Sequence, residues 1–166
     1  MACIITPMHP DDWPAVREIY REGIATGNAT FETELPDWEK WDASHRKDCR
    51  LVARAQDVDQ AVLGWAALSP VSLRRVYAGV AEMSVYMAAS VRGRGIGKAL
   101  LQSLVEESER SGLWTLQAGI FPENSASIAL HKSCGFREVG VRRRIGKLGN
   151  IWRDVLLLER RSSILG

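Results

Sequence analysis

The chain has 166 residues, 46% of them hydrophobic and 25% charged, which predicts one globular domain spanning residues 1–166 and excludes a disordered or fibrous chain. Its net charge of +2 is the small difference between 22 basic and 20 acidic side chains, so we expect no nucleic-acid partner and only local anion sites. Three widely spaced cysteines without a CxxC pair, no apolar run of the roughly 18 residues that span a membrane, and no export signal predict a cytoplasmic protein without a metal site or a membrane partner.

The N-terminal part of the chain predicts a strand and two helices. "ACIIT" is a short apolar run typical of a strand, and "HPDDWPAVREIYREGIA" places Trp13, Val16 and Tyr20 on one helical face. The stretch "TGNATFETELPD" has turn residues and no helical period, so it predicts a loop that can approach a substrate. After this loop, Asp37 is suited to cap a second, short helix in "WEKWDASHRK".

Three β-rich runs follow, and then the hydrophobic period changes. "CRLVARAQ", "AVLGWAALS" and "VAEMSVYMA" are separated by turn residues, which predicts an antiparallel meander. From Gly95 to Gly112 apolar residues repeat at helical spacing, and Gly112 stands where a helix commonly ends.

The C-terminal part predicts a strand, a helix and a strand pair. "LWTLQAGI" is the strand, "ENSASIALHKSC" the helix before Gly135, and "FREVGVRRRIG" pairs with "NIWRDVLLLE" across "KLGN". The triplet Arg142, Arg143 and Arg144 alternates along its strand, so we interpret it as a solvated edge. The whole order, β α α β β β α β α β β, predicts an α/β fold with a mixed central sheet flanked by helices.

The most unusual stretch is "SVRGRGIGKALL", in which arginines alternate with glycines between a strand and a helix. It is not a Walker loop, because Arg92 stands where the first glycine belongs and Ala99 replaces the metal-binding hydroxyl. It is not a dinucleotide fingerprint either, because Lys98 or Leu100 would have to be glycine or alanine. A disordered nucleic-acid-binding tail does not fit a tract held between a strand and a helix.

A seat for an anion such as a pyrophosphate fits this stretch. Glycines let the backbone approach a ligand closely, and the N–H groups at a helix N-terminus attract negative charge. For an isolated motif, a plain tight turn is the simpler interpretation. The predicted seat consists of Arg92, Gly93, Arg94, Gly95, Ile96, Gly97 and Lys98.

Several motifs together resemble one family. The glycine stretch is similar to the Gln/Arg-x-x-Gly-x-Gly/Ala loop of the GNAT acyltransferase superfamily, which holds the pyrophosphate of acetyl-coenzyme A (acetyl-CoA). "ENSASIALHKSCGF" resembles a later segment of that superfamily. "ATFETE", "AEMSVYM" and "GKLGNIWRDVLLLE" resemble the phosphinothricin and methionine sulfoximine or sulfone N-acetyltransferases almost end to end. The resemblance implies a GNAT fold, acetyl-CoA as co-substrate, a small amino-acid-like amine as acceptor, and a homodimer.

The resemblance also implies how the coenzyme is held. The strand in "VAEMSVYMA" would splay from its neighbour, leaving backbone groups of Val85, Tyr86 and Met87 to pair with the pantetheine arm like an added strand. One freed N–H would polarise the thioester carbonyl. Asn124 would hydrogen-bond the same arm from a helix start, and this role is compatible with the ordinary one of an N-cap.

Two residues are candidates for proton transfer. Glu82 is a carboxylate on an otherwise apolar strand, which favours a general base for the amine, although a salt-bridged or edge-facing glutamate has the same pattern. His131 lies two helical turns after Asn124, so it would share its face. It could protonate the leaving thiolate, hold a water that does so, or simply be exposed to solvent. Cys134 is interpreted as a small packing residue.

The acceptor site is predicted from two loops. Arg74 and Arg75 precede the strand of Glu82 and would bind the carboxylate of an amino acid. Thr30 and Phe31 in "NATFE" would form a wall of its side-chain pocket; a plain surface loop is the alternative for all four residues. Glu82 favours an enzyme over a non-catalytic acyl-CoA sensor, and the arginine pair favours a small acid over a protein or peptide N-terminus.

Overall fold

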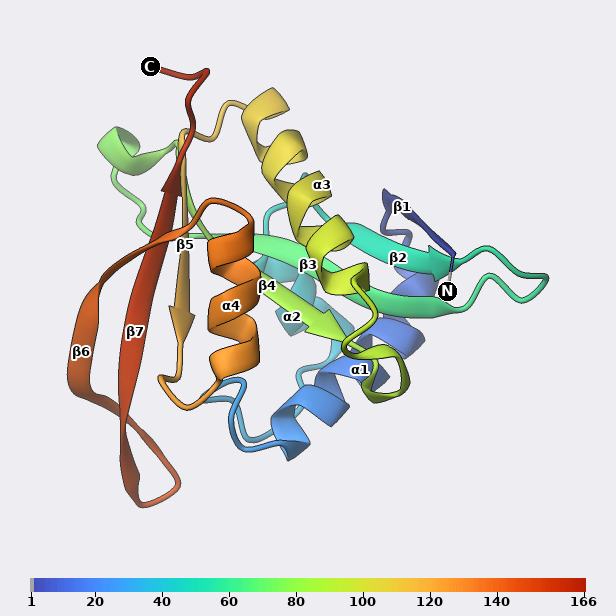
Figure 1. Cartoon of the computed structure of the whole chain (residues 1–166), viewed down its shortest axis with the longest axis horizontal. Coiled ribbons are helices and arrows are strands. Elements are labelled where there is room, and N and C mark those ends of the chain that lie inside the picture. The colour runs from blue at the N-terminus through green and yellow to red at the C-terminus, as the bar shows by residue number, and fades with distance from the viewer. Residues whose placement is uncertain (1) are drawn as a thin grey trace.

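A seven-stranded mixed sheet forms the centre of the computed structural model, which describes residues 2–166 (Figure 1). Its strand order is β1-β2-β3-β4-β5-β7-β6, with β4 and β5 the parallel pair among antiparallel neighbours. The predicted α/β fold with a mixed sheet is therefore confirmed. The strands are β1 (Cys3–Pro7), β2 (Leu51–Ala55), β3 (Val62–Pro70), β4 (Val80–Met87), β5 (Thr115–Ile120), β6 (Arg137–Leu148) and β7 (Ile151–Arg161).

Helices cover both faces of the sheet. In Figure 1, α3 and α4 lie in front of the strands, while α1 and α2 lie behind them. The helices are α1 (Trp13–Ala25), α2 (Trp38–Ser44), α3 (Ile96–Arg110) and α4 (Ser125–Ser133), with short 3-10 turns at Pro10–Asp12, Arg75–Tyr77 and Ala89–Val91. Within residues 2–166, no helix has the length and apolarity needed to cross a membrane.

The period of two along β4 decides which side chains enter each half of the core. Ala81 and Met83 are buried under α3 with Leu100 and Leu104. On the opposite face, Tyr86 packs beside Trp65, Tyr20 and Trp41 under α1 and α2. Glu82 lies on this second face but beyond the cover of the aromatic cluster, so the fold leaves its carboxylate accessible.

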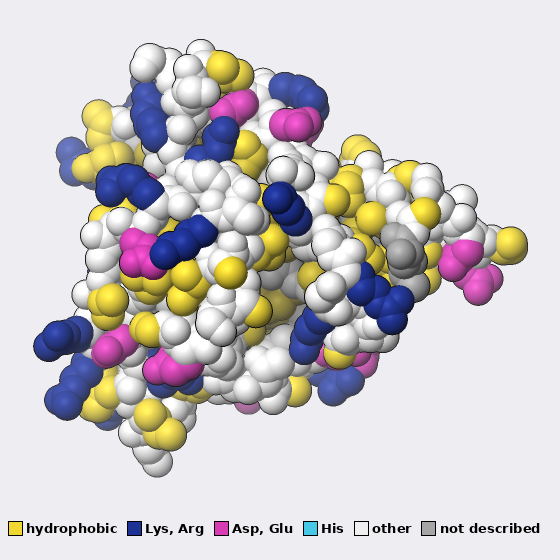
Figure 2. Space-filling model, in the orientation of Figure 1, with side chains coloured by type: hydrophobic (Ala, Val, Ile, Leu, Met, Phe, Trp, Pro, Cys, Tyr) yellow, Lys and Arg dark blue, Asp and Glu magenta, His cyan; other side chains and the backbone are white. Residues whose placement is uncertain are grey.

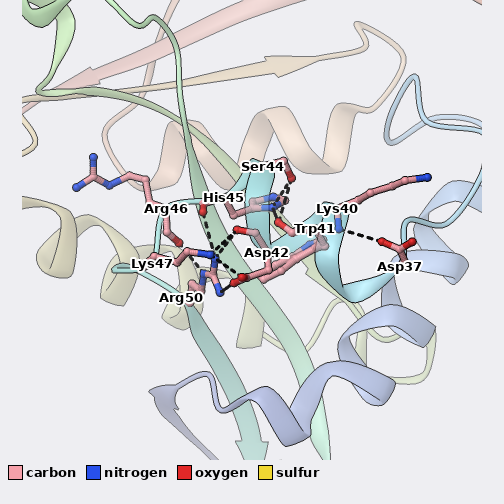
Figure 3. Close-up of polar contacts among 9 residues, drawn as sticks. All are labelled: Asp37, Lys40, Trp41, Asp42, Ser44, His45, Arg46, Lys47 and Arg50. Carbon is pink, nitrogen blue, oxygen red and sulfur yellow. Dashed lines mark hydrogen bonds and ion pairs between the residues drawn. The ribbon is translucent and has the colours of Figure 1, made fainter.

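A polar network fixes the connection from α2 to β2 (Figure 3). The side chain of Asp37 caps α2 by accepting from the Lys40 backbone N–H at 2.9 Å. Arg50 donates to the Asp42 carboxylate at 2.6 Å, and its guanidinium lies 5.0 Å from the ring centre of Trp41. Capping and a half-buried ion pair are ordinary stabilising devices. Because none of these residues lines the main cleft, the network supports the fold rather than the chemistry.

The C-terminal strands depart from the predicted regular pairing. β7 lies between β5 and β6, and the hairpin turn is shorter than expected, since β6 continues to Leu148. The register of β6 also shifts between Arg142 and Gly146, where three residues stand opposite the single residue Asp154 of β7. This bulge breaks the alternation assumed for the arginine triplet. The α2 helix ends at Ser44, because His45 is already in the extended conformation.

Candidate active site

The central feature of the sheet is an opening between β4 and β5. The two strands pair only at Val80–Thr115, Ala81–Leu116 and Glu82–Gln117, and beyond Glu82 they diverge. A cleft of about 870 Å³ lies at this opening. Figure 2 shows it as a hollow between α4 and α3, with basic side chains on the rim near the glycine-rich loop. The splay implied by the family resemblance is therefore present.

The backbone of the glycine-rich loop is shaped for an anion. Gly93 and Gly95 have φ of +76° and +80°, a left-handed conformation that favours glycine, and no atoms lie within 4 Å of a Cβ built on either. Gly95 is also the N-cap of α3, whose first N–H groups have no partner within the helix. The loop therefore presents free donors and the positive end of a helix dipole to the cleft.

The side chains of this loop have different positions. Arg92 and Lys98 line the cleft together with Gly93, Gly95 and Gly97. Ile96 is instead buried in the core, so only its backbone can contact a ligand. Arg94 is exposed and is not among the cleft residues. The loop thus supplies backbone N–H groups and two cations, which fits a pyrophosphate.

The far end of β4 fits a pantetheine arm. Val85, Tyr86 and Met87 all line the cleft, but their backbone groups alternate in direction. Because the Ala88 N–H donates to the Leu63 carbonyl of β3, the Tyr86 backbone also faces β3, and only Val85 and Met87 have backbone groups on the side that β5 has left. The ring of Tyr86 packs closely on Gly23, since a Cβ at Gly23 would lie 2.6 Å from Tyr86 Cδ1. Burial raises the pKa of its hydroxyl. Tyr86 therefore offers neither its phenol nor its backbone at the open edge of β4, and the pairing predicted for a pantetheine arm is left to Val85 and Met87.

Glu82 lies at the point where the strands part. Its side chain opens into the cleft, but surrounding protein displaces enough water to raise its pKa above the ordinary glutamate value, an effect partly offset by the positive charge of Arg142. Gly119 of β5 gives it room, since a Cβ there would be 3.6 Å from Glu82 Oε1 and 3.1 Å from Val155 Cγ1. A carboxylate with a raised pKa in a cleft is suited to proton transfer.

Asn124 links α4 to the loop of residues 26–31. Its Oδ1 accepts from the Ser127 backbone N–H at 3.2 Å, which is the ordinary N-cap bond. Its Nδ2 donates to the Asn28 carbonyl at 3.2 Å. An amide NH₂ has two hydrogens, so one donor remains for a ligand in the cleft.

His131 lines the cleft but is only 3% exposed, so the solvent-exposed interpretation was wrong. The fold buries it because the ring packs edge-on against Phe136, with ring centres 5.2 Å apart. Its Nδ1 lies 2.7 Å from the Ser127 carbonyl oxygen, which can only accept, so Nδ1 carries the proton. Burial lowers its pKa, and the neutral ring then presents Nε2 as an acceptor.

Thr30 and Phe31 lie in the wall of the cleft, on the loop after α1. The Phe31 ring meets Phe121 edge-on at 4.9 Å and lies over Gly146, where a Cβ would be 2.8 Å from its Cζ. Arg153 holds the loop by donating to the Gly27 carbonyl and to Asn28 Oδ1, each at 3.0 Å. The loop is therefore fixed over the cleft from β7.

A model of the acetyltransferase (GNAT) family matches residues 13–136 of the chain. The protein belongs to the GNAT acetyltransferase family. A phosphinothricin N-acetyltransferase from Streptomyces coelicolor is 35% identical over 162 residues, which cover 94% of this chain and 94% of that protein. An L-methionine sulfoximine/L-methionine sulfone acetyltransferase from Pseudomonas paraeruginosa is 28% identical over 151 residues, covering 89% of this chain and 88% of the relative.

The fold comparison agrees. A crystal structure of a phosphinothricin acetyltransferase from Sinorhizobium meliloti in complex with acetyl-CoA matches with a TM-score of 0.85 and 30% identity, covering 97% of this chain and 89% of that one. As a GNAT acetyltransferase, this protein is an acetyl-CoA-dependent N-acetyltransferase. The β4–β5 opening and the glycine-rich loop described above fit that co-substrate.

Two predicted acceptor residues of this GNAT acetyltransferase lie apart from the rest. Arg74 and Arg75 are exposed and do not line the cleft of the single chain. The register explains this, because Pro70 pairs with Ala81, so their loop leaves the sheet at the paired end of β4, away from the open end. The Arg74 guanidinium lies 5.4 Å from the ring centre of Tyr77.

Among the cleft residues that the sequence analysis did not select, two lie near Glu82. Arg142 was set aside with its triplet as a solvated edge, yet it lines the cleft beside Glu82. Gly119 lacks any motif, and its importance comes from the space it leaves between Glu82 and Val155. The missing signal for Arg142 is the strand order, because its pairing with Val155 of β7 brings it to the cleft, and the bulge that follows explains only why Arg144 does not share its face.

Proposed function

We propose that this N-acetyltransferase moves the acetyl group of acetyl-CoA directly to the amine of a small amino-acid-like acceptor, of the phosphinothricin, methionine sulfoximine or methionine sulfone type. The observation that carries this proposal is a single cleft containing both the glycine-rich loop and the Glu82 carboxylate. Both substrates can then meet in one ternary complex. The similarity to relatives named for these acceptors supports the substrate class.

Glu82 is the proposed base. An α-amino group has a pKa of about 8, so its ammonium form dominates near neutrality and cannot attack a thioester. A carboxylate whose pKa is raised by burial accepts this proton, directly or through a water, more readily than an ordinary glutamate does. The nucleophile is thereby released beside the end of β4, where a freed backbone N–H can stabilise the oxyanion.

His131 is proposed to act on the leaving thiolate through a water. In its neutral form, with the Nδ1 proton directed to Ser127, the ring has no proton to donate from Nε2. It can accept from a water, which then orients its second hydrogen toward the sulfur. Asn124 is proposed to hold the pantetheine arm with its remaining N–H.

The acceptor pocket is proposed to lie between Glu82 and the loop carrying Thr30 and Phe31. Replacing Phe31 with alanine removes the ring packed on Phe121 and should raise the acceptor KM without changing acetyl-CoA affinity. Arg74 and Arg75, predicted to bind an acceptor carboxylate, lie outside the cleft of the single chain, so they can reach an acceptor there only from a second copy of the protein. Each is tested by an alanine variant assayed with the acid and with its amide.

We also propose a homodimer. The loop between β3 and β4 carries exposed apolar side chains, with Leu73 at 103% and Val76 at 64% relative exposure, next to Arg74 and Arg75. A second copy packing on this loop would cover them. Light scattering of the purified protein should give twice the chain mass, and Leu73→Asp should reduce it to the single-chain mass; a wild-type monomer refutes the dimer.

The cytoplasm is the proposed compartment, supported by three cysteines, Cys3, Cys49 and Cys134, that are all free thiols. Fractionation of the producing cells, with the protein detected by antibody, checks this. Recovery in an extracytoplasmic fraction would contradict it.

The experiment that tests the function is a rate measurement with purified protein. Thiol release from acetyl-CoA is followed across amino acids, sulfones, sulfoximines and peptides, and each acetylated product is weighed by mass spectrometry. We expect turnover with free amino acids and intersecting lines in double-reciprocal plots, the pattern of a ternary complex. Turnover with peptides alone indicates a peptide acetyltransferase, while coenzyme binding without turnover indicates a sensor.

A further inference from the structure

Arg142 lines the cleft on the side of β6. It lies on β6 opposite Val155 of β7, so both side chains share one face of the sheet. Val155 in turn lies beside Gly119, and Gly119 beside the Glu82 carboxylate. Arg142 and Glu82 therefore line the same cleft from different strands, with Val155 and Gly119 in the sheet that joins them.

The bulge in β6 separates Arg142 from the rest of its triplet. Arg144 has φ of +48° and its backbone N–H donates to Asp154 Oδ1 at 2.8 Å, which holds the bulge against β7. Arg143 and Arg144 are exposed and do not line the cleft. One cation of the three is thus directed to the site, although the sequence shows three alike.

Arg142 is also unpaired among the described residues. Arg153 pairs with Glu123 and Arg160 with Glu109, whereas the side chains of Arg143 and Arg144 have no such partner among the described residues but do not line the cleft. No ion pair or hydrogen bond of the Arg142 side chain is present within residues 2–166, and Glu82 lies within its electrostatic influence without contacting it. A guanidinium and a carboxylate that face one cleft but do not touch leave room for a ligand between them.

We propose that Arg142 binds the carboxylate of the acceptor and so makes this enzyme specific for free amino acids over their neutral derivatives. The inference rests on the proposed function and adds a specificity residue to it. A free amino acid carries an ammonium group beside a carboxylate, and Glu82 and Arg142 present the complementary charges in one cleft. Arginine suits this role because its planar fork binds a carboxylate through two parallel N–H bonds.

The test compares acids with neutral analogues. Wild-type protein and Arg142→Met are assayed with methionine sulfone and with its carboxamide, because methionine retains the unbranched aliphatic part of the side chain without its charge. We expect kcat/KM for the acid to fall about 10- to 150-fold, as for loss of a hydrogen bond between charged groups. The carboxamide rate should change by less than about threefold, and Arg142→Lys should recover part of the loss with the acid.

Two controls make the result specific. Arg143→Met removes an exposed neighbouring charge and should change neither rate, and acetyl-CoA affinity measured by calorimetry should be equal in all variants. Equal losses with acid and carboxamide, or an unchanged rate with the acid, overturn the assignment of Arg142. If the wild-type protein acetylates no free amino acid, the proposed function itself is refuted. That result comes from the wild-type assay, whereas the assignment of Arg142 is tested by the variants.

Discussion

The two ends of the cleft are built in different ways. The donor end consists mostly of backbone, from the left-handed glycines of the loop, the first N–H groups of α3 and the unpaired edge of β4. The proposed acceptor end consists of side chains, with Glu82 from β4, Phe31 from the loop after α1 and Arg142 from β6, which line the same cleft. One end therefore depends on local conformation, and the other on how distant segments pack.

This difference has a functional consequence. A site made of backbone groups binds the same ligand even when its side chains change, which suits a co-substrate shared by a whole family. A site of side chains changes specificity with single substitutions. Substitutions at the two ends should accordingly separate coenzyme affinity from turnover and acceptor choice.

The largest expected effect comes from Glu82→Gln, at the acceptor end. Loss of a general base typically costs about 100- to 10,000-fold in turnover, while acetyl-CoA affinity should stay unchanged. Wild-type activity should fall as the pH drops through the Glu82 pKa, at a higher pH than for an ordinary glutamate, because burial disfavours the carboxylate. The variant should lack this fall and gain rate as the pH approaches the pKa of the amine.

Stopped-flow or steady-state rates between acidic and alkaline pH check this prediction. Glu138→Gln is a matched control, since Glu138 is exposed on β6 and pairs with Lys132 outside the cleft. A pH profile of Glu82→Gln identical to that of the wild type would remove Glu82 as base and leave solvent in that role.

A smaller effect is expected from Gly119→Val, which places a side chain between Glu82 and Val155. Its Cβ would lie 3.1 Å from Val155 Cγ1, so the neighbour must give way. Overpacking typically lowers stability by about 1 to 3 kcal/mol, and if Val155 moves into the acceptor pocket, an equal loss of binding free energy raises the acceptor KM about 5- to 150-fold with acetyl-CoA affinity unchanged. Gly140→Val is the control, because a Cβ at Gly140 meets no atom within 4 Å. Equal KM values in the two variants would mean that Gly119 has no special role.

The smallest effect is expected from Asn124, which joins the two ends. Asn124→Ala removes the cap of α4 and should lower stability by about 1 kcal/mol, or the melting temperature by about 2 to 4 °C. Asn124→Ser keeps the cap but loses the bond to the Asn28 carbonyl, so it should retain stability while raising the KM for both substrates. Calorimetric melting with parallel kinetics separates these roles; a serine variant with wild-type KM values would limit Asn124 to capping.

The sequence predicted the two ends unequally, for a physical reason. The donor loop is one continuous stretch, and its glycines alone indicate a left-handed backbone. The order of helices and strands around it was also predicted, from local periodicity. Glu82 was found because a carboxylate is unusual on an apolar strand. Its neighbours Gly119 and Arg142 come from strands that meet it only through the order β4-β5-β7-β6, which local patterns do not encode.

The position of β7 explains the errors that remain. Because β7 lies between β5 and β6, Arg142 pairs with Val155 of β7 and lines the cleft, while the register shift that follows takes Arg143 and Arg144 out of the regular pairing and they do not line it. Burial of His131 likewise depends on Phe136, which the helix pattern alone does not place against it. Arg74 and Arg75 lie outside the cleft because the loop leaves from the paired end of β4.

A parallel titration of two donor-end variants tests the backbone account most directly. Acetyl-CoA is titrated by calorimetry into Gly95→Val and Lys98→Ala, with Gly112→Val, which has a similar φ of +82° at the other end of α3, as a control for strain. We predict a loss of about 100-fold or more for Gly95→Val, as for two hydrogen bonds to a charged group, and about fivefold or less for the exposed charge of Lys98. Gly112→Val should bind like the wild type. A loss for Lys98→Ala as large as that for Gly95→Val, in folded proteins, would contradict a donor site made of backbone.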